Sequence, residues 1–233
     1  MLISVHIPKT GGASFRSVLM RHFGESLLFD YEDHPMARGA LSRRWQAVRA
    51  MPGSARRLAG YACVHGHFLP LKYRWVQPAQ RAIWLRDPVD RLASRYYHFK
   101  RDVANGVHDT PQFRRYIKTT DLSLEDFARI PLFHNSYAKF LWGSDLDQFD
   151  FVGITEDYAR SMRLFSTLLA VEVDQIPADN TNPQRDLSQG YALPDRLRAY
   201  LQRVNAIDVR LYEQACVRNR LLCQRVLGVQ DVR

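Results

Sequence analysis

LISVHIPKTGGASF, residues 2–15, is the stretch that decides the fold. Its first six residues, Leu2–Ile7, are mostly apolar and predict a buried strand. Gly11 and Gly12 follow, and they allow a tight turn before a helix predicted over Ser14–Phe23. A strand, a glycine-rich turn and a helix in this order predict an anion-binding cradle, because the free N–H groups at the start of the helix point outward.

The side chains of this turn also suit a phosphate or a sulfate. Lys9 adds a positive charge, and Thr10 and Ser14 add hydroxyl donors. The pattern differs from the nucleotide triphosphate loop G-x-x-x-x-G-K-[ST], because the lysine precedes the glycine pair and the first glycine is missing. We therefore expect an anion site of another type, and the alternative is a tight connection that binds nothing.

Three further apolar runs predict strands, and helical stretches separate them. The strands are expected at Tyr61–Val64, Ala82–Leu85 and Phe149–Ile154. The helices are expected at Leu41–Ala50, Pro88–Val103, Ser123–Ile130, Leu132–Trp142, Glu156–Ala170 and, as one helix or two, Asp195–Leu227. This alternation predicts an α/β fold, a single domain over residues 1–233 with a central parallel sheet flanked by helices. Ligands bind such a sheet beyond the carboxyl ends of its strands.

The composition narrows the class of protein. Lys and Arg number 33 against 24 Asp and Glu, so the net charge of +9 indicates an anionic partner such as nucleic acid, an anionic membrane, an acidic sugar or a nucleotide. The three cysteines have no metal-binding or redox spacing, and we expect buried reduced thiols. No apolar run is long enough for a signal peptide or a membrane span, which predicts a cytoplasmic location.

A second candidate site follows the strand predicted at Ala82–Leu85. Arg86 leaves the strand at its carboxyl end, and Asp87 and Pro88 then begin a helix. Ser94 lies about two turns into that helix. An arginine fork and a serine hydroxyl can hold one phosphate together. For this segment taken alone, an Arg–Asp surface pair with a solvated serine is the alternative.

The two segments HIPKTGGASF (6–15) and RDPVDRLASRYYHF (86–99) closely resemble the two cofactor motifs of sulfotransferases that use 3′-phosphoadenosine 5′-phosphosulfate (PAPS). Weaker likenesses to the carbohydrate group, which includes the heparan sulfate and uronyl 2-O-sulfotransferases, lie in HGHF (65–68), FDFVGITEDY (149–158) and IDVRLYEQA (207–215). The resemblance implies a P-loop-nucleotide-hydrolase-like sulfotransferase fold, with PAPS as donor, adenosine 3′,5′-bisphosphate as product and no metal.

The resemblance also assigns cofactor-binding residues. The loop that holds the 5′-phosphosulfate in that superfamily corresponds here to Pro8, Lys9, Thr10, Gly11, Gly12, Ala13 and Ser14. Arg86 and Ser94 have the eight-residue separation of the pair that holds the 3′-phosphate. A basic loop late in the chain often closes over the same phosphate, and Arg185 is the candidate; the alternative is an exposed arginine in a surface loop.

Two histidines follow the strand predicted at Tyr61–Val64. His65 and His67 have the spacing of metal ligands or of two structural histidines, but no third metal ligand stands nearby. A neutral histidine near pH 7 also suits a general base. In the related 2-O-sulfotransferases the second histidine of an H-G-H segment is the base, and this position corresponds to His67. His65 is then a supporting residue or one that contacts the acceptor. Glu32 or Asp33 is the alternative base, since other sulfotransferases use a carboxylate.

These observations predict a PAPS-dependent O-sulfotransferase. His67 and Lys9 are the expected catalytic residues, as the base and as the charge that stabilises the transition state. The expected acceptor is a carbohydrate hydroxyl of a polysaccharide, an oligosaccharide or a glycolipid, acidic or neutral, and a lipid-linked acceptor implies peripheral contact with a membrane. The alternatives are a nucleotide-dependent kinase of related fold and a basic nucleic-acid-binding module. The order of the lysine and glycines counts against the kinase, and the lack of a nucleic-acid motif counts against the module.

A basic cluster between the first predicted helix and the second predicted strand has two alternative interpretations. It is either a groove for an acidic sugar or the solvated face of a helix. Its members are Arg38, Arg43, Arg44, Arg49, Arg56 and Arg57.

Overall fold

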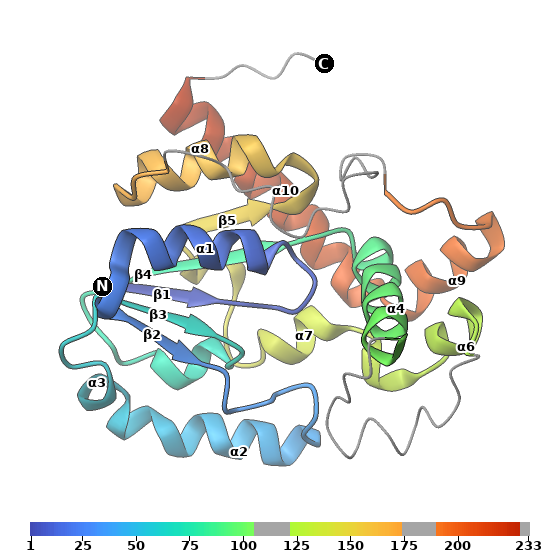
Figure 1. Cartoon of the computed structure of the whole chain (residues 1–233), viewed down its shortest axis with the longest axis horizontal. Helices are drawn as coiled ribbons and strands as arrows, with labels where there is room; N and C mark the ends of the chain where they lie inside the picture. The colour runs from blue at the N-terminus through green and yellow to red at the C-terminus, as the bar shows by residue number, and fades with distance from the viewer. Residues whose placement is uncertain (105–121, 174–189, 229–233) are drawn as a thin grey trace.

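The centre of the protein is a parallel sheet. A computed structural model of the chain describes residues 1–104, 122–173 and 190–228 (Figure 1). Its five strands follow the order β2-β3-β1-β4-β5, and every neighbouring pair is parallel. The strands are β1 (Leu2–Val5), β2 (Leu27–Asp30), β3 (Cys63–Gly66), β4 (Gln80–Leu85) and β5 (Phe151–Ile154). The expected α/β fold with a central parallel sheet is confirmed.

Helices connect the strands and flank the sheet. Their bounds are α1 (Gly12–Phe23), α2 (Ala40–Ala50), α3 (Ser54–Arg57), α4 (Pro88–Ala104), α6 (Leu124–Ala128), α7 (Ser136–Phe140), α8 (Tyr158–Leu169), α9 (Asp195–Val204) and α10 (Ala206–Leu227). The expected starting signal of α4 is confirmed, because the Asp87 carboxylate accepts a hydrogen bond from the Asp90 N–H at 2.9 Å.

One predicted helix is interrupted, and the last stretch, expected as one helix or two, forms two. The stretch expected at Leu132–Trp142 begins instead with a short 3₁₀ turn, and α7 starts only after Asn135, whose φ of 47° is left-handed. The last stretch divides into α9 and α10 at the buried Asn205. These two asparagines contact each other, since the Asn135 N–H donates to the Asn205 side-chain oxygen at 2.9 Å. The two breaks therefore lie against each other in the fold.

The sheet alternates between two apolar layers. Leu2 of β1 and Trp84 of β4 face α1 and α8, where they pack with Phe15 and Phe165. On the opposite face, Ile3, Val5 and Ile83 pack with Tyr73, Tyr137 and the first half of α10. In Figure 1, α1 lies across the sheet and α8 lies beside α1.

A separate group of helices stands beyond the carboxyl ends of the strands. Helices α4, α6 and α9 share a small core that includes Val89, Phe127 and Leu201. Figure 1 shows the strand arrows pointing toward this group. The loops that leave β1, β3 and β4 therefore face the helical group, and these loops carry the residues singled out in the sequence. Within the described ranges, no helix is long and apolar enough to cross a membrane.

Candidate active site

The loop between β1 and α1 has a constrained backbone. Gly11 caps α1 with a φ of 86°, in the left-handed region that glycine favours. Gly12 is required for a different reason, because a Cβ at this position would lie only 1.8 Å from Nε2 of His6. His6, which directly follows β1, therefore touches Gly12, the first residue of α1. No residue larger than glycine fits at position 12 beside the imidazole.

The start of α1 is open to an anion. Its first turn holds no acidic residue, and no side chain caps it. Thr10 is buried and its hydroxyl donates to the Ile7 carbonyl at 2.9 Å, so this hydroxyl braces the loop from within. Thr155, which follows β5, has its Oγ1 3.0 Å from the carbonyl oxygens of both Thr10 and Leu85. This contact fixes the loop against the end of β4.

Lys9 carries the charge of the loop and stands among other cations. Its φ of 74° is left-handed, which is uncommon for a residue with a Cβ. Burial, followed by the positive charges of Arg95, Arg101 and Arg86, lowers the pKa of Lys9 to about 8, against a smaller opposite effect of Asp102. Burial is the largest cause of the lowered pKa, and Arg95, Arg101 and Arg86 add repulsion that a bound polyanion would relieve.

Arg86 leaves β4 with its charge poorly compensated. Its side chain is buried, and its Nε and Nη2 have no hydrogen-bond partner among the described residues. The nearest described carboxylate is Glu156, with Oε1 3.8 Å from Nε. The Arg86 backbone is held firmly, because its N–H donates to the Tyr137 hydroxyl at 3.0 Å and its carbonyl accepts a hydrogen bond from the same hydroxyl. A rigidly placed guanidinium with two unused nitrogens is suited to a phosphate.

Helix α4 adds further polar groups on the same side. Ser94 is buried on this helix, eight residues after Arg86. Arg91 has a structural role, since its Nη2 donates to Ser136 Oγ at 2.9 Å and to the Phe133 carbonyl at 3.2 Å. Arg95 lies close enough to Lys9 and His67 to lower the pKa of both side chains.

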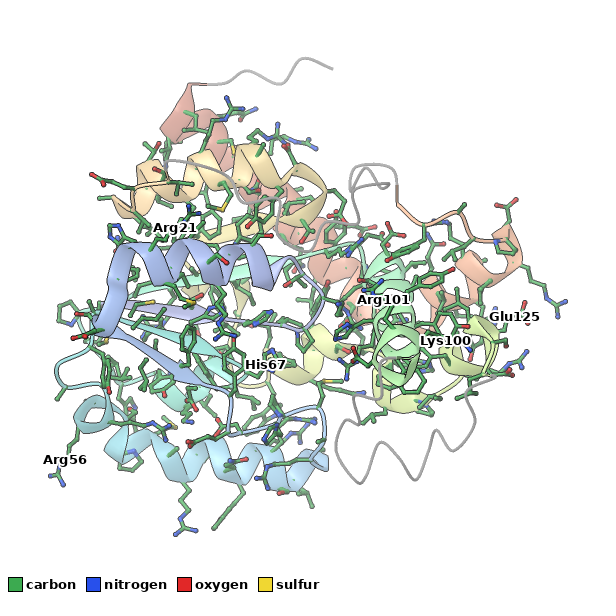
Figure 2. All side chains as sticks on the ribbon, viewed as in Figure 1. Arg21, Arg56, His67, Lys100, Arg101 and Glu125 are labelled. Atoms are coloured by element: carbon green, nitrogen blue, oxygen red, sulfur yellow. The ribbon has the colours of Figure 1, made fainter. Side chains whose placement is uncertain are left out.

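Three histidines from two strand ends form one cluster. The His6 ring stacks on His65 at 5.1 Å between ring centroids and lies 4.6 Å from the His67 ring. Tyr31, which follows β2, packs edge-on against His67 at 4.6 Å, and its hydroxyl is 3.1 Å from Nδ1 of His6. Figure 2 shows His67 at the carboxyl ends of the strands, on the side where α4 carries Arg101. The cluster therefore lies next to the anion loop.

All three histidines are held in the neutral form. Burial is the largest cause, followed by positive charge on neighbouring groups, and it lowers the pKa of His67 to about 2 and that of His65 to about 3. The pKa of His6 is also well below its usual value. Nε2 of His65 and Nε2 of His67 are both buried without a described hydrogen-bond partner. The two rings differ at Nδ1, because His65 Nδ1 is held by Ser4 Oγ at 2.8 Å.

The two alternative carboxylates are engaged elsewhere. Both Asp33 oxygens lie 2.9 Å from Nζ of the buried Lys72, which also binds Asp30 at 2.6 Å. Glu32 is exposed and pairs with Arg57 at 3.2 Å. The geometry therefore favours His67 over both carboxylates as a base.

The family of the chain follows from comparison with known proteins. A family model described as "Sulfotransferase family" matches residues 1–214. The chain belongs to the sulfotransferase family. A solved sulfotransferase from Alicyclobacillus acidocaldarius is 20% identical, with a TM-score of 0.49, over 91% of this chain and 94% of that chain. No curated protein gives a significant match.

Sequence reasoning about this sulfotransferase missed part of the site. His6 was assigned to a buried strand, and Tyr31 and Arg95 were not singled out. The placement of His6 between two other histidines depends on strand order, which no local pattern reveals. Arg185 lies outside the residues that the structure describes, and the side chain of Ala13 is not described either. In the described part of the chain, no three His, Cys, Asp or Glu side chains are placed to hold a metal ion.

A pocket of about 400 Å³ opens beside the histidine cluster of the sulfotransferase. Its lining residues are His6, Gly12, Arg16, Ser17, Met20 and Tyr31. The Arg16 guanidinium lies 4.4 Å from the centre of the Phe29 ring and forms no ion pair with a described carboxylate. Because His6 and Tyr31 also contact His67, the pocket begins one ring away from the candidate base.

Proposed function

We propose that this sulfotransferase moves the sulfuryl group of PAPS to a hydroxyl of a carbohydrate acceptor. The observation that carries the proposal is the juxtaposition of a cationic loop, with Lys9 at its centre, and a neutral histidine with an unpartnered Nε2. The loop suits an anionic donor, and the histidine suits a hydroxyl that must lose its proton.

The residues present fit the donor. Lys9 and the uncapped start of α1 would hold the 5′-phosphosulfate, because both concentrate positive charge on the loop. Arg86 and Ser94 would hold the 3′-phosphate, and the two unused nitrogens of Arg86 would gain partners there. PAPS, when bound, supplies a sulfuryl group whose transfer releases adenosine 3′,5′-bisphosphate.

The protein's part in the reaction is proton removal and charge stabilisation. Nε2 of His67 takes the proton of the acceptor hydroxyl. A pKa of about 2 makes the ligand-free imidazole a weak base, but nearby negative charge raises a histidine pKa, so an anionic donor makes His67 a better base. Lys9 and the first N–H groups of α1 stabilise the negative charge that develops on the leaving side. The His6 ring, which contacts the His67 ring at 4.6 Å between centroids, helps to orient His67.

The pocket beside His67 supports a sugar acceptor with an acidic group. Arg16 places one cation there, and the Tyr31 hydroxyl adds a hydrogen-bonding group next to it. A guanidinium pairs well with a carboxylate or a sulfate ester. We infer that the acceptor occupies this pocket with its anionic substituent toward Arg16 and its reacting hydroxyl toward His67.

The test is a PAPS-dependent transfer assay over a panel of acidic and neutral sugars, with the product mass measured. We expect His67→Asn to lower kcat by roughly 10²- to 10⁴-fold, the usual contribution of a general base, without weakening adenosine 3′,5′-bisphosphate binding. His22→Asn, at an exposed histidine in the last turn of α1, is the matched control and should retain full activity. Unchanged turnover in His67→Asn would remove His67 from this role.

A further inference from the structure

The positive charge of the protein comes from one segment. Residues 34–86 contain ten Lys or Arg side chains and no Asp or Glu, whereas the other 180 residues carry 23 basic and 24 acidic side chains and are nearly neutral. This segment forms α2, α3, β3 and β4. Arg86 is assigned to the donor site, and Lys72 and Arg57 pair with carboxylates of the fold. Arg49 of α2 and Arg56 of α3 are among those left without such a role.

Helix α2 carries an apolar stripe on its outer face. Leu41, Trp45 and Val48 are 81%, 62% and 48% exposed, and their i, i+4, i+7 spacing places them on one line along the helix. The opposite face packs on the protein through the buried Arg43 and Ala47. The outer stripe is therefore additional to the face that the fold needs.

Arginines stand along both sides of this stripe. Arg49 lies with its guanidinium 5.0 Å from the centre of the Trp45 ring, and Arg44 lies 4.8 Å from the ring of Trp142. Arg56 of α3 extends away from the body of the protein just past the end of α2 (Figure 2). Neither Arg49 nor Arg56 forms an ion pair with a described carboxylate.

We propose that the outer face of α2 docks on an anionic lipid surface. Arginines alone would suit an acidic polysaccharide equally well, but such a ligand gives Leu41 and Val48 nothing to bury against. An apolar stripe between arginines, with a tryptophan at its centre, fits the boundary between lipid headgroups and acyl chains. The absence of any Asp or Glu over residues 34–86 removes the repulsion that an anionic surface would otherwise meet.

The experiment measures flotation of the full chain with two kinds of vesicle, phosphatidylcholine containing phosphatidylglycerol and phosphatidylcholine alone. We expect binding to the anionic vesicles only, weakening as salt is added. Leu41→Ser/Trp45→Ser should lower the partition coefficient by about tenfold or more, because it removes the buried apolar area. Arg49→Gln/Arg56→Gln should lower it by about fivefold for each arginine.

Control variants separate docking from loss of fold. Val217→Ser/Leu221→Ser removes two similarly exposed apolar residues of α10, at 54% and 59%, and should float like the unmodified chain. Every variant should keep the thermal shift given by adenosine 3′,5′-bisphosphate, which reports an intact fold independently of the acceptor. No flotation of the unmodified chain with anionic vesicles would overturn the proposal, and so would an equal loss in the α10 variant.

A soluble polyanion separates lipid from polysaccharide. We expect dextran sulfate to bind more weakly to Arg49→Gln/Arg56→Gln and with unchanged affinity to Leu41→Ser/Trp45→Ser. If the apolar variant also leaves vesicle binding unchanged, the face is a polyanion site and lipid docking is wrong.

Discussion

Lys72 and Arg86 are both buried cations near the carboxyl edge of the sheet, at 3% and 5% exposure, and their surroundings are opposite. Lys72 contacts the carboxylates of Asp30 and Asp33 at 2.6 and 2.9 Å. Arg86 has two nitrogens without a hydrogen bond and a carboxylate no nearer than 3.8 Å among the described residues. The first cluster is complete within the fold. The second leaves two guanidinium nitrogens without hydrogen bonds, which supports the proposal that Arg86 holds the 3′-phosphate of the donor.

The sharpest way to break this comparison is Lys72→Met. The change leaves Asp30 and Asp33 as two buried carboxylates without their cation, which costs about 3–5 kcal/mol of unfolding free energy. Urea unfolding followed by circular dichroism measures the loss. A matched Lys100→Met change on α4 should cost far less, and equal losses in the two variants would show that the Lys72 cluster is not special.

The counterpart change, Arg86→Met, should weaken ligand binding more than it weakens the stability of the fold. We expect adenosine 3′,5′-bisphosphate affinity to fall by roughly 10- to 100-fold, corresponding to about 1.5–3 kcal/mol for hydrogen bonds to a charged group. Unfolding free energy should fall much less than in Lys72→Met, because Glu156 keeps its hydrogen bonds from the Asp87 N–H and the Tyr212 hydroxyl and the repulsion with Lys9 is removed. Calorimetric titration and urea unfolding give the two values. A large loss of stability with unchanged affinity would assign Arg86 to the fold.

The contact between residues 6 and 12 allows a double-mutant test. Gly12→Ala places a Cβ into the His6 imidazole and should destabilise the protein by about 1–3 kcal/mol. His6→Ala removes the ring, so the double variant should recover most of that cost. The double-mutant cycle compares the unfolding free energies of the unmodified protein, the two single variants and the double variant. Additive effects would contradict the contact.

The pH dependence of stability sharpens the comparison further. The pKa values of His65 and His67, about 3 and 2, are below those of an unfolded histidine, so the unfolded chain binds more protons as the pH falls below about 6.5. Stability conferred by these neutral histidines is present above pH 6.5 and is lost as the pH falls, by up to about 1.4 kcal/mol per pH unit for each histidine. Thermal melts between pH 7 and 4 measure the slope, and His67→Asn should reduce it. An unchanged slope would show that His67 ionises normally.

Much of the fold was predictable from local sequence. The strands β1, β3, β4 and β5 follow apolar runs, and the predictions place them and the helices α1, α2, α4 and α8 within a few residues. A capping signal, at Asp87, marks the start of α4. Strand β2 was missed because it is a four-residue edge strand with two half-buried positions, and it lacks a distinctive pattern. The break at Asn135 is not predicted, because it depends on a tertiary contact with Asn205. The sequence leaves Asp195–Leu227 open as one helix or two, and the structure has two, α9 and α10.

The site was only partly predictable. The sequence indicated the segments that bear Lys9, Arg86 and His67, since each directly follows an apolar run. It could not indicate that Tyr31 and His6 would meet His67, because this requires β2, β3 and β1 to be neighbours in that order. Thr10 is a case in which the sequence suggests a ligand contact and the structure shows an internal one. The hydroxyl is expected to donate to an anion, and it donates instead to the Ile7 carbonyl.

The Thr155 hydroxyl, 3.0 Å from the carbonyls of Thr10 and Leu85, has a consequence for which molecules the protein can select. This hydroxyl connects the loop between β1 and α1, which carries Lys9, to the end of β4, which Arg86 directly follows. The fold therefore holds the separation of the two anion positions that we propose for the donor. If both positions bind as proposed, a molecule with a single phosphate satisfies one of them, and a molecule whose two anionic groups have the matching separation satisfies both.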